Sequence, residues 1–334
     1  MNNPADQSAQ ERLFPFTLTR PVVDIRVGIL TIREKWLIFT GSGKPDGIPS
    51  NVIPTKYLPG LLNNAGDVTA IPGVLYINRP WEIFQHNDVA IREDFNVLTS
   101  GRTSLAVSST NQVINPDGIF LEEGARVECA MLNAATGPIY IGRNAEIMEG
   151  SMIRGPVALC EGAVVKMGSK IYGATTIGPY SVAGGEIKNS VIFGYSNKAH
   201  DGYLGDSVIG EWCNLGAGTS NSNLKNTAAH IKIYNPVHEP DNTPGQKCGL
   251  LMGDYSRAAI NTSFNTGTVT GVCCNIFGEG LTSTYIPSFS WGGKNHGRYA
   301  LDKALRDISS WKKLKNKVLT DEEVDKLTAI FHQL

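Results

Sequence analysis

Four side chains that could bind and deprotonate a small molecule lie within one short stretch, AHDGYLGDSVIGEWCNLGAGTSNSN. They are His200, Tyr203, Asn214 and Asn223. An imidazole exchanges protons near neutral pH, so a positioned histidine can act as a general base and raise a rate by about 10²–10⁴. A phenol and two amides can bind the hydroxyl groups of a polar substrate. The alternative is structural, because a single histidine at a corner often only satisfies a backbone carbonyl.

The elements that must position these residues are indicated by a repeat of six residues. Aliphatic side chains recur at every sixth position, and a small side chain, or at most valine, follows each of them four residues later. A helix and an alternating strand both lack this period, whereas a parallel β-helix has it, with three hexads closing each coil. The aliphatic residues are Ile141, Ile147, Ile153, Leu159, Val165, Ile171 and Ile177, and the small ones are Ala145, Ser151, Val157, Ala163, Ser169, Thr175 and Ser181. The sequence therefore predicts a β-solenoid whose coils stack at the parallel-strand spacing, roughly 4.8 Å.

The repeat resumes after interruptions, which indicates how far the solenoid extends. Ile209 and Leu215 continue it, and a further series follows within 252–276. We expect a β-helix domain over 113–283, with a loop at 224–250 that is too long for a corner and should project. The sequence HIKIY within that loop is expected to form a small hairpin.

Two other regions flank the predicted solenoid. Residues 1–112 lack the six-residue period and mix strand-like runs with prolines and glycines, so we expect a separate small domain there. Residues 284–334 carry apolar side chains at a 3.6-residue period, and Thr320 with Glu323 has the spacing of a capping box. This helical tail is expected to cover the last open coil and so to protect a sheet edge.

Composition excludes several classes of protein. Charged residues make up 18 % of the 334 residues and the net charge is −1, so we expect no nucleic-acid partner. No run of about 18 apolar residues is present, so no membrane span is expected. The polar N-terminus lacks the apolar core of a secretory signal, and the six cysteines form no CxxC pair. These features favour a soluble cytoplasmic protein.

A solenoid alone does not define a function, and two non-transferase alternatives remain open at this point. The chain could be a non-catalytic scaffold or binding protein. It could also hold a metal between three histidines, as γ-class carbonic anhydrases do. Only His200 lies in clear coil register, since His230 and His238 fall in the projecting loop. We therefore expect no bound metal in the solenoid.

The segment SNKAHDGYLGDSVIGEWCNLGAGTSNSN resembles the acetyltransferase half of the bifunctional glucosamine-1-phosphate acetyltransferase / N-acetylglucosamine-1-phosphate uridyltransferase family. That family carries K-A-G-H-x-x-Y-L-G-D followed by N-I-G-A-G-T-x-x-x-N-Y. The resemblance implies that His200 is the catalytic general base. It implies that Tyr203 and Asn214 contact the sugar and that Asn223 orients the amine. It also places Lys188 where the family binds the phosphate, a role that suits the point charge of a lysine.

The sequence departs from the family pattern at two positions. Leu224 stands where the family has a tyrosine after the second asparagine. No arginine occupies the upstream phosphate position, and Lys170 is the nearest basic residue. With these departures, the resemblance still implies a left-handed β-helix, acetyl-CoA as donor, an amino-sugar phosphate as acceptor and a homotrimer.

The full length is similar to a divergent, shorter, Bacteroidetes-type branch of the same family, described as a sugar nucleotidyltransferase with an acyltransferase solenoid. The phrases that carry this resemblance are LFPFTLTRPVVDIRVGILTIREKW, GPIYIGRNAEIMEGSMIRGP, GGEIKNSVIFGYSNKAHDGYLGD and IPSFSWGG. It implies that 1–112 is a reduced α/β nucleotidyltransferase-like domain. It also implies a second activity, with UTP or dTTP as substrate and Mg²⁺ as cofactor.

The N-terminal domain lacks the glycine-rich loop with which sugar nucleotidyltransferases cradle phosphates. Arg20 and Arg26 could bind nucleotide phosphates instead, because a guanidinium offers two parallel donors, and Asp24 could assist a metal. Ordinary ion pairs between these residues and neighbouring carboxylates are an equally good explanation.

Overall fold

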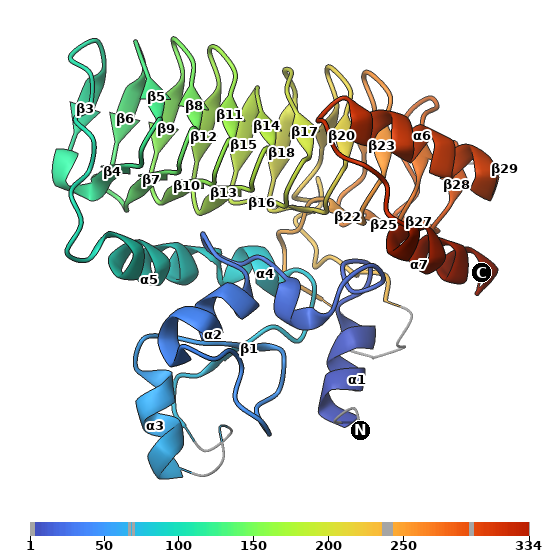
Figure 1. Ribbon diagram of the computed structural model, residues 1–334. Helices are drawn as coiled ribbons and strands as arrows, with labels where there is room; N and C mark the ends of the chain where they lie inside the picture. The colour runs from blue at the N-terminus through green and yellow to red at the C-terminus, as the bar shows by residue number, and fades with distance from the viewer. Residues whose placement is uncertain (1–3, 66–67, 69–70, 236–242, 294–296, 334) are drawn as a thin grey trace.

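The computed structural model describes residues 4–65, 68, 71–235, 243–293 and 297–333. The chain forms one long β-helix, with a smaller, mainly helical part along one side and two helices at the C-terminal end (Figure 1). Within the described residues, no helix has the length and apolar character needed to span a membrane. The predicted parallel β-helix with a helical tail is confirmed. In its described residues the N-terminal part is helical apart from one two-stranded antiparallel sheet, so its assignment as a reduced α/β nucleotidyltransferase-like domain stays a prediction.

Three parallel sheets form the faces of the β-helix, and we name them face A, face B and face C. Face A contains β4 (Ile119–Leu121), β7 (Ile139–Ile141), β10 (Val157–Leu159), β13 (Thr175–Ile177), β16 (Val191–Ile192), β19 (Val208–Ile209), β22 (Leu251–Met252), β25 (Val269–Thr270) and β27 (Tyr285–Ile286). Face B contains β5 (Arg126–Val127), β8 (Glu146–Ile147), β11 (Val164–Val165), β14 (Val182–Ala183), β17 (Asn197–Lys198), β20 (Asn214–Leu215), β23 (Arg257–Ala258), β26 (Asn275–Ile276), β28 (Ser290–Trp291) and the antiparallel β29 (Gly297–Arg298). Face C contains β3 (Gln112–Ile114), β6 (Met131–Asn133), β9 (Met152–Arg154), β12 (Lys170–Tyr172), β15 (Glu186–Lys188) and β18 (Tyr203–Gly205), and the pair β21 (Ser220–Asn221) and β24 (Ser263–Phe264) follows on the next coils.

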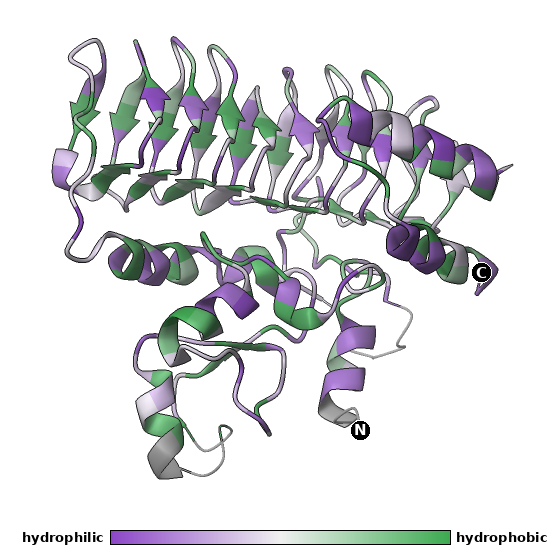
Figure 2. Ribbon diagram, in the orientation of Figure 1, coloured by the Kyte–Doolittle hydropathy of each residue, from purple (hydrophilic) through white to green (hydrophobic). Residues whose placement is uncertain are grey.

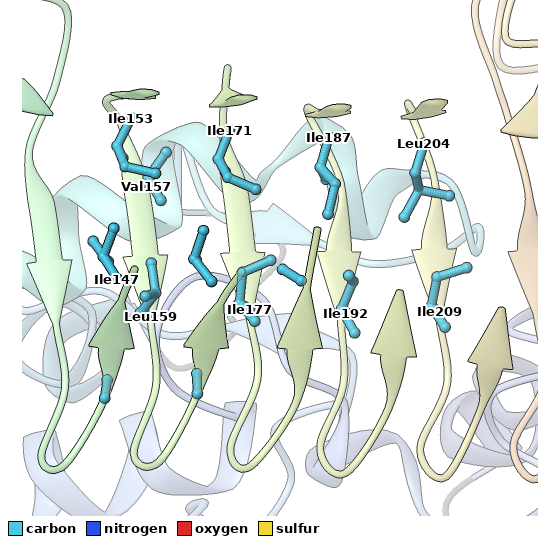
Figure 3. Close-up of a cluster of buried hydrophobic side chains, with 14 of the residues drawn as sticks. Ile147, Ile153, Val157, Leu159, Ile171, Ile177, Ile187, Ile192, Leu204 and Ile209 are labelled. Atoms are coloured by element: carbon cyan, nitrogen blue, oxygen red, sulfur yellow. The ribbon is translucent and has the colours of Figure 1, made fainter. Parts of the chain in front are cut away.

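The axis of the β-helix is filled by the aliphatic residues that the repeat identified. All seven are buried in one continuous cluster. Figure 3 shows five of them on successive strands: Ile147, Ile153, Leu159, Ile171 and Ile177. The small residues that follow them are fully buried as well. Val157 pairs with Ile139 on one side and with Thr175 on the other, so one early coil takes eighteen residues. The predicted solenoid is therefore confirmed rung by rung, and Figure 2 shows its hydrophobic bands along the strands.

One interior rung is a lysine. Lys198 pairs with Ala183, an axial residue of face B, and its side chain is only 1 % exposed. The small Ala183 leaves room beside it. The Lys198 Nζ donates to the backbone oxygen of His200 at 2.5 Å and to that of Gly184 at 3.3 Å. The amine thus reaches the corner between faces B and C and fixes the backbone there.

The N-terminal part packs against the outer side of face A. It contains α1 (Pro4–Arg12), a 3-10 turn η1 (Val22–Asp24), α2 (Ile32–Thr40), β1 (Val52–Ile53), α3 (Leu58–Ala65), β2 (Leu75–Tyr76), α4 (Glu82–Gln85) and α5 (Asn87–Thr99). Its apolar residues share one cluster with Val191, Val208 and Leu251 of face A. A fully buried ion pair between Lys35 and Asp94 joins α2 to α5. This part therefore has no core that is independent of the β-helix.

The described residues of the projecting loop do not contain the predicted hairpin, although the Ile231 N–H donates to the Gly245 oxygen at 2.8 Å. No strand is present over 231–235. Instead Ile231 and Ile233 are buried in the cluster that joins the N-terminal part to face A. The alternation of apolar and polar residues in HIKIY thus reflects packing of its two isoleucines against that part. His238 lies outside the described residues.

The helical tail is present, but the sheet edge is closed in a different way from the one predicted. α6 (Leu301–Lys313) and α7 (Asp321–His332) lie beside the corner between faces A and B, and Thr320 and Glu323 form the predicted capping box. The edge of face B is covered by β29, which pairs antiparallel with β28. The tail packs on a column of aromatic corner residues that includes Trp212, and that contact holds it beside the coils.

Lys198 predicts a specific pH dependence of stability. Burial lowers the pKa of its amine from 10.5 to about 8. Between these values the unfolded chain binds more protons than the folded chain, so stability must rise with pH. We expect the unfolding free energy of the wild type to gain up to about 3 kcal/mol between pH 8 and 10.5, relative to Lys198→Met. Urea unfolding of both proteins across this range measures the difference, and parallel pH profiles would contradict it.

Candidate functional site

Most of the predicted site residues lie on or beside face C. The strand register stacks Lys170, Glu186 and Tyr203 in one outward column, with Tyr172 and Lys188 in the next. The Nζ of Lys188 lies 5.8 Å from the centre of the Tyr172 ring. Two cations, two phenols and a carboxylate are therefore adjacent on three successive coils.

A hydrogen-bond network holds Tyr203 and Asn223 together. The Nδ2 of Asn223 donates to the Tyr203 hydroxyl at 3.1 Å and to Oδ2 of Asp206 at 2.5 Å. The other carboxylate oxygen of Asp206 accepts from Nδ2 of Asn189 at 2.6 Å. Asn189 and Asp206 occupy equivalent corners of successive coils, with φ angles of 47° and 48°, a conformation that Asn and Asp adopt more readily than most residues.

Both phenols of the face stay protonated at neutral pH. Burial, followed by the charge of Asp206, raises the pKa of Tyr203 to about 12. The Tyr172 hydroxyl donates to Oε1 of Glu186 at 2.7 Å, and that bond together with burial raises the pKa of Tyr172 to about 12. The Tyr203 oxygen accepts from Asn223, so its own proton is available to a ligand.

His200 lies at the opposite end of β18 from Asp206. It occupies the corner between faces B and C, and its side chain is exposed. The Lys198 amine holds its backbone oxygen from inside. Gly202 in the same corner has a φ of 120°, and a Cβ there would lie 2.1 Å from the Thr219 oxygen. This corner therefore requires glycine at position 202. Its backbone conformation determines the position of His200.

The C-terminal end of β18 is fixed from inside as well. Asn221 occupies an interior rung, paired with the axial Phe264. Its side-chain oxygen accepts from the Gly205 amide at 2.9 Å, and its Nδ2 donates to the Gly205 oxygen at 3.1 Å. Two polar rungs, Lys198 and Asn221, thus hold the strand that carries Tyr203.

Two of the predicted residues, Asn214 and Lys170, do not join this network, and neither does Leu224, which stands where the family has a tyrosine. Asn214 lies on face B, where its Oδ1 is 3.5 Å from Nδ2 of Asn197. Leu224 is 41 % exposed and bridges to Lys247 at the start of the projecting loop. Lys170 is exposed in the outward column and contacts no member of the network. The structure thus brings together Lys188, Tyr203 and Asn223, and it places His200 at the adjacent corner.

The sequence prediction missed Asp206, Asn189, Glu186 and Tyr172. Asp206 belongs to the motif YLGD, so its proximity to Tyr203 could have been found from the sequence. Asn189 and Asp206 recur at one corner, but the coil between them is shorter than eighteen residues. A fixed period of eighteen residues therefore could not predict that these two corner residues lie next to each other.

A shallow groove of about 710 Å³ runs along face C over the earlier coils. Met131 and Met152 give it an apolar floor, and it ends at Lys170 and Tyr172. The polar network lies on the coils that follow. Face C therefore changes from an apolar surface to a polar one at β12.

The predicted nucleotide-binding residues are all engaged with other groups. Arg20 contacts Asp254 and lies 3.3 Å from Glu211. Burial alone would lower the pKa of Arg20, but these two carboxylates raise it. Asp24 accepts from Arg33 at 2.6 Å, and Arg26 lies 3.6 Å from Glu34. These contacts are the ion pairs that the sequence left as the alternative, and nucleotide binding stays a prediction.

Arg20 and Asp24 line a pocket of about 460 Å³ between the N-terminal part, the β-helix and α7. Its other charged residues include Glu211, Glu322 and Lys326. Nowhere in the described chain do three His, Cys, Asp or Glu side chains converge as a metal would require. The residues present therefore do not fit a Mg²⁺ site, since that ion needs several oxygen ligands in octahedral geometry.

Comparison with known proteins finds sequence similarity to transferases. A family model described as sugar nucleotidyl transferase matches residues 5–58. The Bifunctional protein GlmU of Methanocaldococcus jannaschii is 28 % identical over 212 residues, which cover 64 % of this chain and 45 % of that protein. The Bifunctional sugar-1-phosphate nucleotidylyltransferase/acetyltransferase of Sulfurisphaera tokodaii is 28 % identical over 202 residues, which cover 54 % of this chain and 50 % of that protein.

Among solved structures, the UDP-N-acetylglucosamine acyltransferase of Francisella novicida is 11 % identical with a TM-score of 0.31, covering 68 % of this chain and 84 % of that one. The chain spans about half the length of the two sequence relatives described above. The resemblance predicted from the sequence is confirmed: this chain is similar in sequence to bifunctional sugar-1-phosphate nucleotidyltransferase/acetyltransferases.

Proposed function

We propose that this chain is an acyl-CoA-dependent transferase that moves an acetyl group from acetyl-CoA to an amino-sugar phosphate. The observation that carries the proposal is the grouping of Lys188, Tyr203 and Asn223 on face C. A β-helix does not need these residues for its stability, because its core lies on the other side of the strands. The names of the two sequence relatives support the same class of reaction.

Each residue then has a role that its chemistry allows. The Lys188 amine binds the phosphate as a point charge. The Tyr203 hydroxyl and the Asn223 amide bind the sugar close to its nitrogen. His200 accepts a proton from the amine while the nitrogen attacks the thioester carbonyl, a C–N bond forms, and the C–S bond breaks. The proton passes to the leaving thiolate and gives free CoA.

We further propose that the site is completed between copies of the chain in a homotrimer. The support is the division of the predicted residues between two faces, since Tyr203 lies on face C and Asn214 on face B. One copy alone cannot bring these two side chains to the same ligand. A neighbouring copy can present its face B and its His200 corner to face C.

The first test is a thiol-release assay with acetyl-CoA and glucosamine 1-phosphate. We expect His200→Ala to lower kcat by about 10²–10⁴ because a positioned base is lost. His230→Ala is the matched control, since this exposed histidine lies on the projecting loop. Its turnover should equal that of the wild type.

Two results would count against this assignment. Full turnover by His200→Ala shows that another group is the base. Failure of the wild type to bind acetyl-CoA in calorimetry removes the transferase proposal and favours the alternative of a non-catalytic scaffold.

The assembly is tested by light scattering in solution. We expect a mass of three chains, and we expect activity to fall as dilution separates them. Mixing inactive Tyr203→Phe with inactive Asn214→Ala should restore part of the activity, because one mixed interface regains both residues. A monomer with full activity would rule out the shared site.

Nucleotidyl transfer is a second candidate, favoured by the match of the family model to residues 5–58. It predicts release of pyrophosphate from UTP or dTTP with a sugar 1-phosphate and Mg²⁺. Arg33→Ala removes the ion-pair partner of Asp24 in the N-terminal part. Because this part lies apart from face C, the variant should keep the acyl-transfer activity of the wild type. If the wild type releases no pyrophosphate with any of a panel of sugar phosphates, the N-terminal part has a structural role only.

A further inference from the structure

A buried carboxylate determines how the amide of Asn223 is oriented. Asp206 is 4 % exposed, and each of its two side-chain oxygens accepts from an amide, one from Asn189 and one from Asn223. Carboxylate oxygens offer only acceptors to an amide, so Asn223 must turn its NH₂ group toward Asp206. The assignment of nitrogen and oxygen in this amide therefore follows from the network around it.

The same network uses both hydrogens of the Asn223 NH₂ group. One is donated to Asp206 and the other to the Tyr203 hydroxyl. Among the described residues, none donates to the side-chain oxygen of Asn223. The site is thus left with an acceptor oxygen that cannot exchange places with the amide nitrogen, next to a phenol that still has a proton to donate.

We propose that Asp206 is a positioning residue that makes the site select an amine over a hydroxyl as the acyl acceptor. The inference rests on the proposed acyl transfer. An amine nitrogen keeps an N–H after the base has removed one proton, and that N–H can donate to Asn223 while the lone pair attacks. A hydroxyl has a single hydrogen, and once the base takes it nothing remains for the Asn223 oxygen. An acceptor that the bound sugar covers and leaves unpaired in this way raises the barrier for the hydroxyl.

The step balances for the amine. The nitrogen lone pair forms the C–N bond with the thioester carbon, and the C–S bond electrons leave with the sulfur. The base passes the first proton to the thiolate, and the second N–H remains on the amide product. Asp206 touches neither reactant and acts only through Asn223.

The test compares glucosamine 1-phosphate with glucose 1-phosphate in the wild type and in Asp206→Asn. Asparagine tolerates the left-handed φ of this corner, so the backbone should be preserved. With an amide in place of the carboxylate, the Asn223 amide is free to rotate and present its nitrogen. We expect the ratio of kcat/KM for the amine over the hydroxyl to fall at least about 10-fold.

Calorimetry provides a readout that does not depend on turnover. Before any proton moves, an amine can donate to both His200 and the Asn223 oxygen, whereas a hydroxyl has one hydrogen for these two acceptors. The wild type should therefore bind the amino sugar about 10-fold more tightly than the hydroxy sugar, and Asp206→Asn should lose most of that preference. Glu186→Gln is the matched control, because it removes a carboxylate from the same face without a contact to Asn223. Its amine-to-hydroxyl ratio should equal that of the wild type. Asn223→Ala lacks the acceptor oxygen and should lose the preference for the amino sugar, as Asp206→Asn does. If Asp206→Asn does not fold, Asn223→Ala tests whether the acceptor oxygen sets the preference.

The outcomes separate the two proposals. An unchanged binding ratio in the folded variants, or no binding of either sugar phosphate by the wild type, overturns the role of Asp206. A binding preference that Asp206→Asn abolishes, with no acyl transfer by the wild type, overturns the proposed function and leaves the role of Asp206 in selecting the amine.

Discussion

The narrow apolar axis of the β-helix is the constraint on which the rest of the structure depends. Each coil can place one aliphatic side chain per face in the axis, and only a small residue fits at the position four residues later. Ile153, Ile171 and Ile187 illustrate this, since they stack on one face and are almost completely buried (Figure 3). Because side chains fill the axis, every residue that could bind a ligand lies on an outer face or at a corner.

The corners carry the distinctive chemistry of the chain. Their left-handed backbone favours glycine, asparagine or aspartate, and this chain has placed other residues there at a cost in backbone free energy. At the corner between faces A and B, Tyr195 stacks on Trp212 with ring centres 4.5 Å apart, and the C-terminal helices pack on this column. At the corner between faces C and A, Asn189 and Asp206 form the polar network. One column therefore anchors the tail, and the other orients the candidate site.

Whether the position of a residue could be predicted from the sequence depended on what determines that position. The axial residues depend on a fixed period, so the solenoid was predictable from sequence. The faces depend on coil length, which is eighteen residues early on, fifteen where Val182 pairs with Asn197 and seventeen where Asn197 pairs with Asn214. These shorter coils and the long loop determine the face on which each side chain lies, and no fixed period reveals them. Ile231 packs against the N-terminal part, and Arg20 pairs with Asp254. Both contacts join segments that are far apart in the sequence, so a local pattern could not predict them.

The polar rungs of the axis support placing the function at β18. Lys198 and Asn221 occupy slots that aliphatic residues fill elsewhere, and a buried amine or amide costs free energy unless it is hydrogen-bonded. Both side chains are used to hold backbone groups at the two ends of one strand, through the oxygen of His200 and the amide of Gly205. An aliphatic residue in either slot would keep the solenoid and lose that restraint. We infer from these polar rungs that the function requires a fixed position of β18 and of the Tyr203 side chain that it carries. This requirement outweighs the free energy that aliphatic packing of the axis would contribute at that coil.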